Sequence, residues 1–177
     1  MPELLKQNTK QQNELKIFPD SSWLIAVMDD FDSHYKSALS SFGAIRPYKP
    51  IFYITPIVYL EIMSRLIKKK KISVKKCHDK IQKFLSGIEY KHKTSLDLKE
   101  ITQKFKAFSR IKISKRLSAI DFYVVAEGIA LDAKILTCDL NMYHIAKKYY
   151  KNIYFLTDQV KNQKSDLSRL INDIQNT

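Results

Sequence analysis

The chain has 177 residues, a net charge of +13 and 45% hydrophobic residues. This length and apolar content suit one domain with a substantial core and argue against wholesale disorder. No apolar run approaches the roughly 20 residues that span a bilayer. The polar N-terminus has no signal-peptide core, so we expect a cytoplasmic protein without membrane association. The two cysteines stand apart, which predicts neither a disulfide framework nor a zinc site.

The charge and the glycines narrow the function further. Lys and Arg outnumber Asp and Glu by 31 to 18, which favours a polyanionic partner, with nucleic acid first and an acidic protein second. The three glycines, Gly43, Gly87 and Gly128, are isolated, so the chain has no GxGxxG or GxxxxGK[ST] loop. A nucleotide site built on such a loop is therefore not expected.

The apolar patterns predict strands that alternate with helices. Strands are expected at 14–18, 51–55, 88–93, 134–138 and 152–157, with the third at a sheet edge. Helices are expected at 21–31, 32–42, 56–70, 74–87, 95–110, 117–133, 141–150 and 164–177. This alternation predicts an α/β fold around a mainly parallel sheet of four to five strands. We assign a polar N-terminal tail to 1–14, the main domain to 15–157 and a C-terminal tail or helix to 158–177.

Acidic residues fall at equivalent places in this predicted order. Asp20 and Asp139 follow strands, Asp121 begins a helix, and Glu61 lies about one turn into the helix after the second strand. Because the carboxyl ends of parallel strands share one edge of a sheet, we expect these four acids to lie near each other. Clustered carboxylates repel unless a cation neutralises them. With no His or Cys set beside them, they predict Mg²⁺ or Mn²⁺.

Each of these acids also has a purely structural explanation. Asp20 and Asp139 can cap the helices that follow them. Asp121 stands three residues after a serine, which is a capping-box pattern. Glu61 can pair with Arg65 at i, i+4 on a solvated helix face. We favour the metal site because four caps at a single sheet edge would be an unusual arrangement.

The stretches DSSWLIAV, TPIVYLEIMSRL and LSAIDFYVVAEGIALDAKILTCDLNMY resemble the PIN-domain ribonuclease family, notably the VapC-like toxins of type II toxin–antitoxin systems. That family has an Asp and a small polar residue after the first strand, a Glu in an apolar helix, an Asp opening a long Ala-containing helix, and Thr-x-Asp after a short strand. The matching residues are Asp20 with Ser21 and Ser22, Glu61, Asp121, and Thr137 with Asp139. The resemblance covers 15–157. It departs at Pro19, where the family runs an apolar strand into the Asp, and at 72–110, which matches only a helical insert.

The resemblance implies a three-layer α/β/α sandwich and a metal-dependent endoribonuclease that leaves 5′-phosphate and 3′-hydroxyl ends. The residues it assigns to catalysis and to one or two divalent ions are Asp20, Glu61, Asp121 and Asp139. Ser21 and Thr137 are expected to orient the carboxylates or their waters. Such toxins also dimerise and bind a small antitoxin near the metal site, so the expected partners are RNA, an antitoxin and a second copy of the chain.

Two groups of basic residues suit the RNA backbone. One lies within 65–83 and includes Lys68 and Lys69, with a solvated surface as its alternative explanation. The other leads into the helix of Asp121 and comprises Arg110, Lys112, Lys115 and Arg116. Contacts to phosphates position a strand without reading its sequence, so both groups predict salt-sensitive RNA binding.

Two further functions fit the same residues. One is a housekeeping RNA-processing nuclease of the same fold, which the absence of an adjacent antitoxin reading frame would favour. The other is a non-catalytic RNA-binding or scaffold version of the fold. The four acids argue against this last function, because a binding module gains nothing from clustered negative charge beside RNA.

Overall fold

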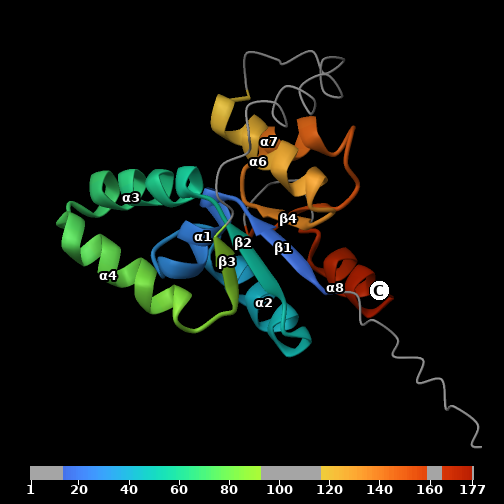
Figure 1. The fold of residues 1–177 in the computed structure, drawn as a ribbon, viewed down its shortest axis with the longest axis horizontal. Helices are drawn as coiled ribbons and strands as arrows, with labels where there is room; N and C mark the ends of the chain where they lie inside the picture. The colour runs from blue at the N-terminus through green and yellow to red at the C-terminus, as the bar shows by residue number, and fades with distance from the viewer. Residues whose placement is uncertain (1–13, 93–116, 159–164, 177) are drawn as a thin grey trace, which may run out of the picture.

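The computed structural model describes residues 14–92, 117–158 and 165–176, which form one five-stranded sheet flanked by helices (Figure 1). The strands are all parallel and lie in the order β3-β2-β1-β4-β5. Their bounds are β1 Lys16–Pro19, β2 Ile51–Ile54, β3 Tyr90–His92, β4 Lys134–Thr137 and β5 Ile153–Phe155. The helices are α1 Ser21–Met28, α2 Tyr35–Ile45, α3 Pro56–Lys70, α4 Val74–Leu85, α6 Ala119–Ala130, α7 Leu140–Ala146 and α8 Leu167–Gln175, with a 3-10 turn at Arg46–Tyr48. The predicted α/β class, parallel sheet and edge strand are confirmed.

Neighbouring residues of β1 show that helices cover both faces of the sheet. Phe18 faces α6. Its Cβ lies 3.9 Å from the position that a Cβ on Gly128 of α6 would occupy. Ile17 faces the opposite side, as successive strand residues do. On that side Trp23 of α1 stacks against Phe52, the β2 partner of Ile17, with ring centroids 6.2 Å apart. The predicted three-layer α/β/α arrangement is therefore present.

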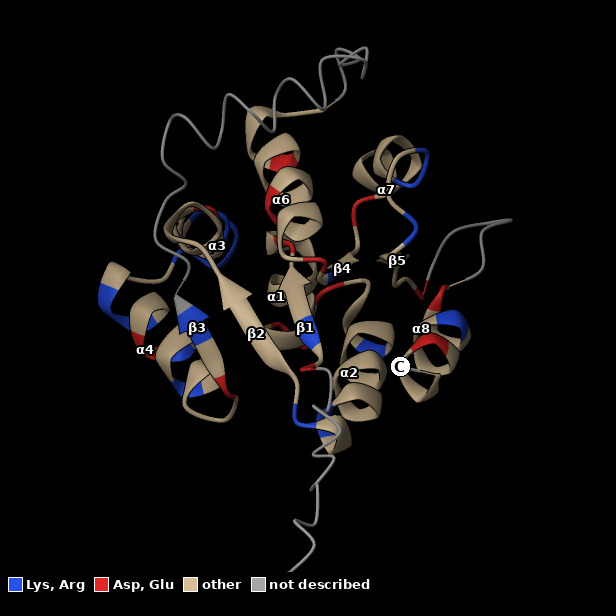
Figure 2. Ribbon diagram, turned by 45° about the vertical axis from the view of Figure 1, so that its right-hand side comes forward, with Lys and Arg blue, Asp and Glu red and all other residues tan. Residues whose placement is uncertain are grey.

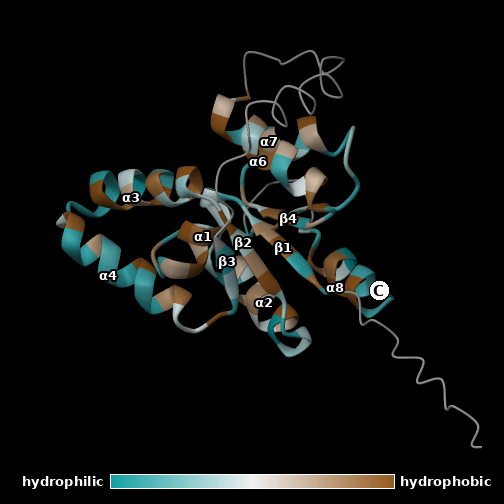
Figure 3. Cartoon of the chain, viewed as in Figure 1, coloured by the Kyte–Doolittle hydropathy of each residue, from teal (hydrophilic) through white to brown (hydrophobic). Residues whose placement is uncertain are grey.

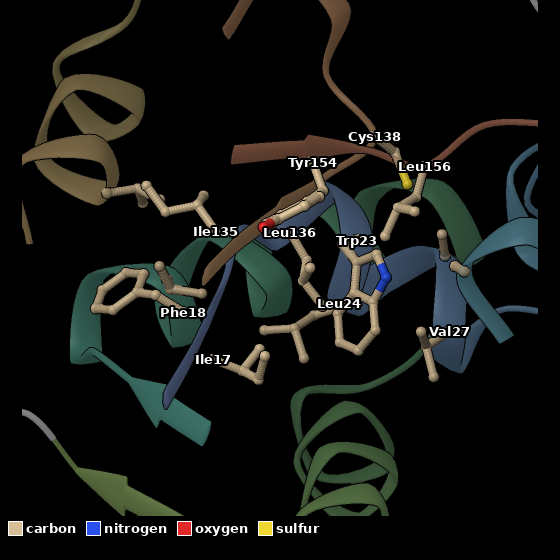
Figure 4. Close-up of a cluster of buried hydrophobic side chains, with 14 of the residues drawn as sticks. Ile17, Phe18, Trp23, Leu24, Val27, Ile135, Leu136, Cys138, Tyr154 and Leu156 are labelled. Atoms are coloured by element: carbon tan, nitrogen blue, oxygen red, sulfur yellow. The ribbon is translucent and has the colours of Figure 1, made fainter. Parts of the chain in front are cut away.

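Large buried side chains fill the space between α1 and the sheet. Figure 4 shows Trp23 and Leu24 of α1 beside Leu136 and Tyr154 of the strands, and each is at most 1% exposed. The Trp23 indole N–H donates to the Ser41 hydroxyl at 2.9 Å, so its polar atom is satisfied. Burial of side chains of this size contributes roughly 1.5–3 kcal/mol each. In Figure 3 the hydrophobic residues concentrate in the central strands, whereas α4 carries many hydrophilic ones.

Helices α1 and α2 differ from their predicted bounds at the junction between them. The sequence predicts a helix over 21–31, but α1 ends before Asp29, whose backbone is extended (φ −120°, ψ 101°). The Asp29 carboxylate accepts the Phe31 N–H at 3.2 Å, which favours a turn over another helical residue. Asp32 accepts the His34 N–H at 3.0 Å in the same way. Helix α2 therefore begins after His34 and not at Asp32.

Helix α3 has its predicted bounds, and the C-terminal helix packs onto the sheet. Thr55 is the N-cap of α3 and accepts a backbone N–H at 3.3 Å. Pro56 occupies the first turn, where the missing N–H needs no partner. In α8, Leu170 and Ile174 are buried, and this helix contacts β5 and α2.

Some predictions lie outside the described residues, among them most of the N-terminal tail and the helix at 95–110. Within the described part of the chain, no helix is both long enough and apolar enough to cross a membrane.

Candidate active site

Asp20 lies directly after β1, caps α1 and is 2% exposed. Its Oδ2 accepts the backbone N–H of Ser22 at 3.2 Å and the Ser22 hydroxyl at 2.5 Å. The Thr137 hydroxyl donates to the same oxygen from the end of β4 at 3.1 Å. The Ser21 hydroxyl lies 3.4 Å from Oδ1. The carboxylate is thus fixed in one orientation at the edge of the sheet where β1 and β4 end.

The environment of Asp20 disfavours its negative charge. Burial raises the pKa of its carboxyl group above the usual range, although hydrogen bonds from Ser22 and Thr137 oppose this effect. The charges of Asp121 and Glu61 raise the pKa further. Residues from three different segments, at 20, 61 and 121, are therefore close enough for their charges to interact. A cation among them would relieve the repulsion.

Ser22 and Thr137 join the ends of β1 and β4. The Asp139 N–H donates to the Thr137 hydroxyl oxygen at 2.9 Å. The Cys138 N–H donates to the Ser22 hydroxyl oxygen at 2.9 Å. Thr137 thus contacts both Asp20 and the backbone of Asp139, as an orienting residue should. The sequence pattern predicted Ser21 for this role and not Ser22, whose contacts are shorter. The available signal was the position of Ser22 two residues after a capping Asp, where the N-cap carboxylate accepts a backbone N–H.

Glu61 lies in α3 with its side chain 13% exposed. Its Oε1 accepts a hydrogen bond from Arg65 Nη2 at 2.6 Å, so the predicted i, i+4 ion pair is present. Its Oε2 is buried and has no hydrogen-bond partner among the described residues. An unsatisfied buried acceptor costs roughly 1–3 kcal/mol, so this oxygen is a natural position for a ligand.

Asp121 and Asp139 both serve as caps. Ser118 and Asp121 form a reciprocal capping box: the Ser118 N–H donates to Asp121 Oδ2 at 2.9 Å, and the Asp121 N–H donates to Ser118 Oγ at 3.1 Å. Asp139 Oδ1 accepts the N–H groups of Asn141 and Met142 at 2.8 and 3.0 Å. Both acids therefore have the capping role that their sequence positions suggest. Each uses one carboxylate oxygen as the acceptor. Figure 2 shows acidic residues in α6 and at the start of α7.

The chemistry of the four acidic residues suits a hard divalent cation. They offer carboxylate oxygens, and one of these, Glu61 Oε2, is buried and unsatisfied. Within residues 14–92, 117–158 and 165–176, however, no three His, Cys, Asp or Glu side chains are placed to share an ion as they stand. The Arg65–Glu61 pair and the Asp121 capping box hold two of the carboxylates in other contacts. Binding of a cation therefore requires these side chains to turn.

A cavity of about 620 Å³ opens beside the acidic strand ends. Ser22, Cys138 and Asp139 line one part of it, and the basic residues of α3 line another. These basic residues are Arg65, Lys68 and Lys69. Burial raises the pKa of the Cys138 thiol, so this group is a neutral wall of the cavity and not a nucleophile. The cavity thus combines acidic and basic surfaces.

The predicted RNA-binding residues have different positions. Lys68 lines the cavity. Lys69 also lines it, but its ammonium group lies 3.1 Å from Asp32 and 3.5 Å from Asp29. Burial alone would lower the pKa of Lys69, but the hydrogen bond to Asp32 and the charges of both acids raise it. Lys69 is therefore a partly neutralised cation. The remaining members, Arg110, Lys112, Lys115 and Arg116, lie outside the described residues.

Comparison with known proteins identifies the family. A model of the PIN domain matches residues 17–148, and the chain belongs to this family, as its motifs predict. A search of curated protein sequences finds no match.

The solved structures that are similar to the chain include the following two. The first is VapC20 of Mycobacterium tuberculosis, described as a sarcin-ricin loop cleaving toxin. It is 14% identical, with a TM-score of 0.52, over 72% of this chain and 93% of that one. The second is a domain of a protein of unknown function from Methanocaldococcus jannaschii. It is 18% identical, with a TM-score of 0.46, over 85% of this chain and 96% of that one. The first likeness shows that this chain and VapC20 share a fold.

Proposed function

We propose that this protein is a divalent-metal-dependent endoribonuclease. PIN domains are generally nucleases, and membership of the family supports this reaction. The observation that carries the proposal is the buried carboxylate of Asp20, whose pKa is raised by burial and by the charges of Asp121 and Glu61. Burying a carboxylate costs stability, and groups with such perturbed pKa values cluster at functional sites, which supports a function for Asp20. Its hydrogen-bond partner Ser22 lines a cavity that α3 also lines with basic residues, which suits a phosphodiester substrate.

The residues have distinct parts in this proposal. The four acids would hold Mg²⁺ or Mn²⁺, which activates a water and stabilises the leaving oxygen when bound. Thr137 and Ser22 fix the carboxylate of Asp20 through hydrogen bonds of 3.1 and 2.5 Å. Lys68 contributes positive charge to the cavity for the backbone of the RNA.

We further propose that the protein is the toxin of a toxin–antitoxin pair, acting on RNA in the cytoplasm. The fold shared with VapC20, a toxin described as cleaving the sarcin-ricin loop, supports this assignment. A small antitoxin protein and a second copy of the chain are the proposed partners. An antitoxin reading frame next to this one would favour a toxin over a housekeeping nuclease.

Cleavage of total RNA by the purified protein tests the proposed reaction. We expect products with 5′-phosphate ends in Mn²⁺ or Mg²⁺ and none in EDTA. Asp121→Asn should abolish cleavage, whereas Asp79→Asn, at an exposed site in α4, should cleave as wild type does. Cleavage that continues in EDTA, or in the Asp121 variant, would contradict the proposal.

A further inference from the structure

The ion pair between Glu61 and Arg65 is asymmetric. The side chain of Glu61 is 13% exposed, whereas that of Arg65 is 48% exposed, although their polar atoms lie 2.6 Å apart. Arg65 holds only one oxygen of the carboxylate, and the other, Oε2, is buried with no hydrogen-bond partner among the described residues. An Arg that used its planar fork fully would contact both oxygens. The pair therefore leaves Glu61 only partly satisfied.

Arg65 also reaches the candidate active site. It lines the cavity that contains Asp139 and Ser22, and Lys68 stands one turn further along α3 in the same cavity. The guanidinium group is as well suited to a phosphate as to a carboxylate, because both accept its parallel N–H donors. With half of its side chain exposed, Arg65 can turn from Glu61 towards the cavity without leaving the core unfilled.

We propose that Arg65 has two partners in turn, an inference that rests on the nuclease function proposed above. Without a divalent cation it is the counter-ion of Glu61. When a cation is bound, the Glu61 carboxylate turns to it, and Arg65 is released to bind a phosphate of the RNA strand in the cavity. The unsatisfied Oε2 offers the incoming cation a contact before the ion pair breaks. Metal binding and RNA binding are thereby coupled through one side chain.

The first test is the affinity of the full-length protein for Mn²⁺ alone, measured by calorimetry. Arg65→Gln removes the competitor for Glu61, so its Mn²⁺ dissociation constant should fall at least about fivefold, the lower end of typical couplings. Lys68→Gln is the matched control. It removes the same charge from the same cavity but not the bond to Glu61. A general charge effect would tighten both variants equally and would overturn the proposal.

A second variant tests whether Arg65 competes with Mn²⁺ for Glu61 or only repels the ion through its nearby charge. In a Glu61→Gln background the ion pair is already absent, so adding Arg65→Gln should leave the Mn²⁺ affinity unchanged. Equal tightening with and without Glu61 would also overturn the proposal. Melting curves in EDTA check that each variant is folded, which the exposure of Arg65 favours.

The third test uses a short single-stranded RNA whose linkages are replaced by hydrolysis-resistant phosphorothioates, so that the proposed nuclease leaves it intact in Mn²⁺. In EDTA, Arg65→Gln should bind this RNA as wild type does, because Arg65 is held by Glu61. In Mn²⁺ the variant should bind it about fivefold more weakly. Lys68→Gln should weaken binding by the same factor in both conditions. A loss of RNA affinity in EDTA from Arg65→Gln would show a constant phosphate contact and overturn the two-partner inference.

The proposed function and this inference can fail separately. If wild type binds Mn²⁺ and cleaves RNA but Arg65→Gln changes neither affinity, the inference is wrong and the nuclease function stands. If wild type binds no Mn²⁺, both are wrong.

Discussion

The Thr137 hydroxyl donates a hydrogen bond of 3.1 Å to the Asp20 carboxylate, although the two residues are 117 positions apart in the chain. The contact exists because β1 and β4 are neighbouring parallel strands, with Pro19 opposite Leu136, so their carboxyl ends coincide. The same hydroxyl oxygen accepts the Asp139 N–H at 2.9 Å. One buried side chain therefore connects two of the proposed metal ligands.

Replacing Thr137 with Val should lower both stability and activity. Val keeps the shape but leaves the buried Asp20 carboxylate without one donor and the Asp139 N–H without its acceptor. We expect a loss of about 1–3 kcal/mol in the free energy of unfolding, measured with urea, and slower RNA cleavage. Thr137→Ser keeps the hydroxyl and should retain most of both. Equal stability of the Val variant and wild type would contradict this role for the hydroxyl.

The pH dependence of stability should reveal the charge on Asp20. Because burial raises the folded-state pKa of this carboxyl above its usual value of 3.8, the folded state prefers the protonated form. Its contribution therefore decreases stability as the pH rises above 3.8 and levels off once the raised pKa is passed. In EDTA, urea unfolding at pH 5 and pH 7.5 should show a smaller decrease for Asp20→Asn than for wild type. An identical pH dependence in the two proteins would argue against a raised pKa at this site.

Two glycine substitutions should have opposite effects on stability. A Cβ on Gly128 would lie 2.5 Å from Cγ1 and Cδ1 of Ile135, which is fully buried, so Gly128→Ala forces α6 away from β4. We expect a net loss of about 1–2 kcal/mol, since overpacking exceeds the gain in helix propensity. Gly43 lies in α2, and a methyl group added there would meet no atom within 4 Å, so Gly43→Ala should stabilise by about 0.5–1 kcal/mol. Melting temperatures that shift in the same direction would contradict the close contact at Gly128.

Asp29 should be important for stability and not for metal binding. It is fully buried, and its carboxylate lies 2.8 Å from the ammonium group of Lys70. Burial alone would raise the pKa of Asp29, but the hydrogen bonds from Lys70 and the Phe31 N–H lower it overall. Asp29→Asn should cost about 3 kcal/mol at pH 7, the lower end for a broken buried ion pair, because Lys70 is partly exposed. Because the folded-state pKa is lowered, this difference should shrink as the pH falls below 3.8. Unchanged Mn²⁺ affinity in this variant is also expected.

Local sequence signals predicted the parts of the fold that depend on local chemistry. Helix α3 has its predicted bounds because Thr55, Pro56 and an amphipathic pattern all specify them. The predicted junction between α1 and α2 was wrong, because the carboxylates of Asp29 and Asp32 accept the Phe31 and His34 N–H groups and form turns where a helix was expected. The contact of Lys69 with Asp32, 37 positions away, also stabilises this junction, and the local sequence gives no sign of it.

In the candidate site, too, some features could be predicted from the sequence and others depend on distant contacts. The order of strands was enough to predict that Asp20 and Asp139 lie at one edge of the sheet, and the i, i+4 spacing was enough to suggest the pair of Glu61 with Arg65. The contact of the Ser22 N–H with Asp20 follows from its position after a capping Asp, but the contact of its hydroxyl with the Cys138 N–H could not be predicted, because Cys138 follows β4 and is 116 positions away. Whether each of the four acids caps a helix or binds the proposed metal depends on how its side chain is rotated. The order of the acids in the sequence does not specify this rotation.

Anomalous diffraction from crystals soaked in Mn²⁺ would locate the proposed ion among the acidic side chains. We expect a peak among the carboxylates of the four acids, Asp20, Glu61, Asp121 and Asp139, with the Glu61 side chain turned away from Arg65. A Mn²⁺ peak elsewhere, or none in crystals saturated with the ion, would contradict the proposed metal site.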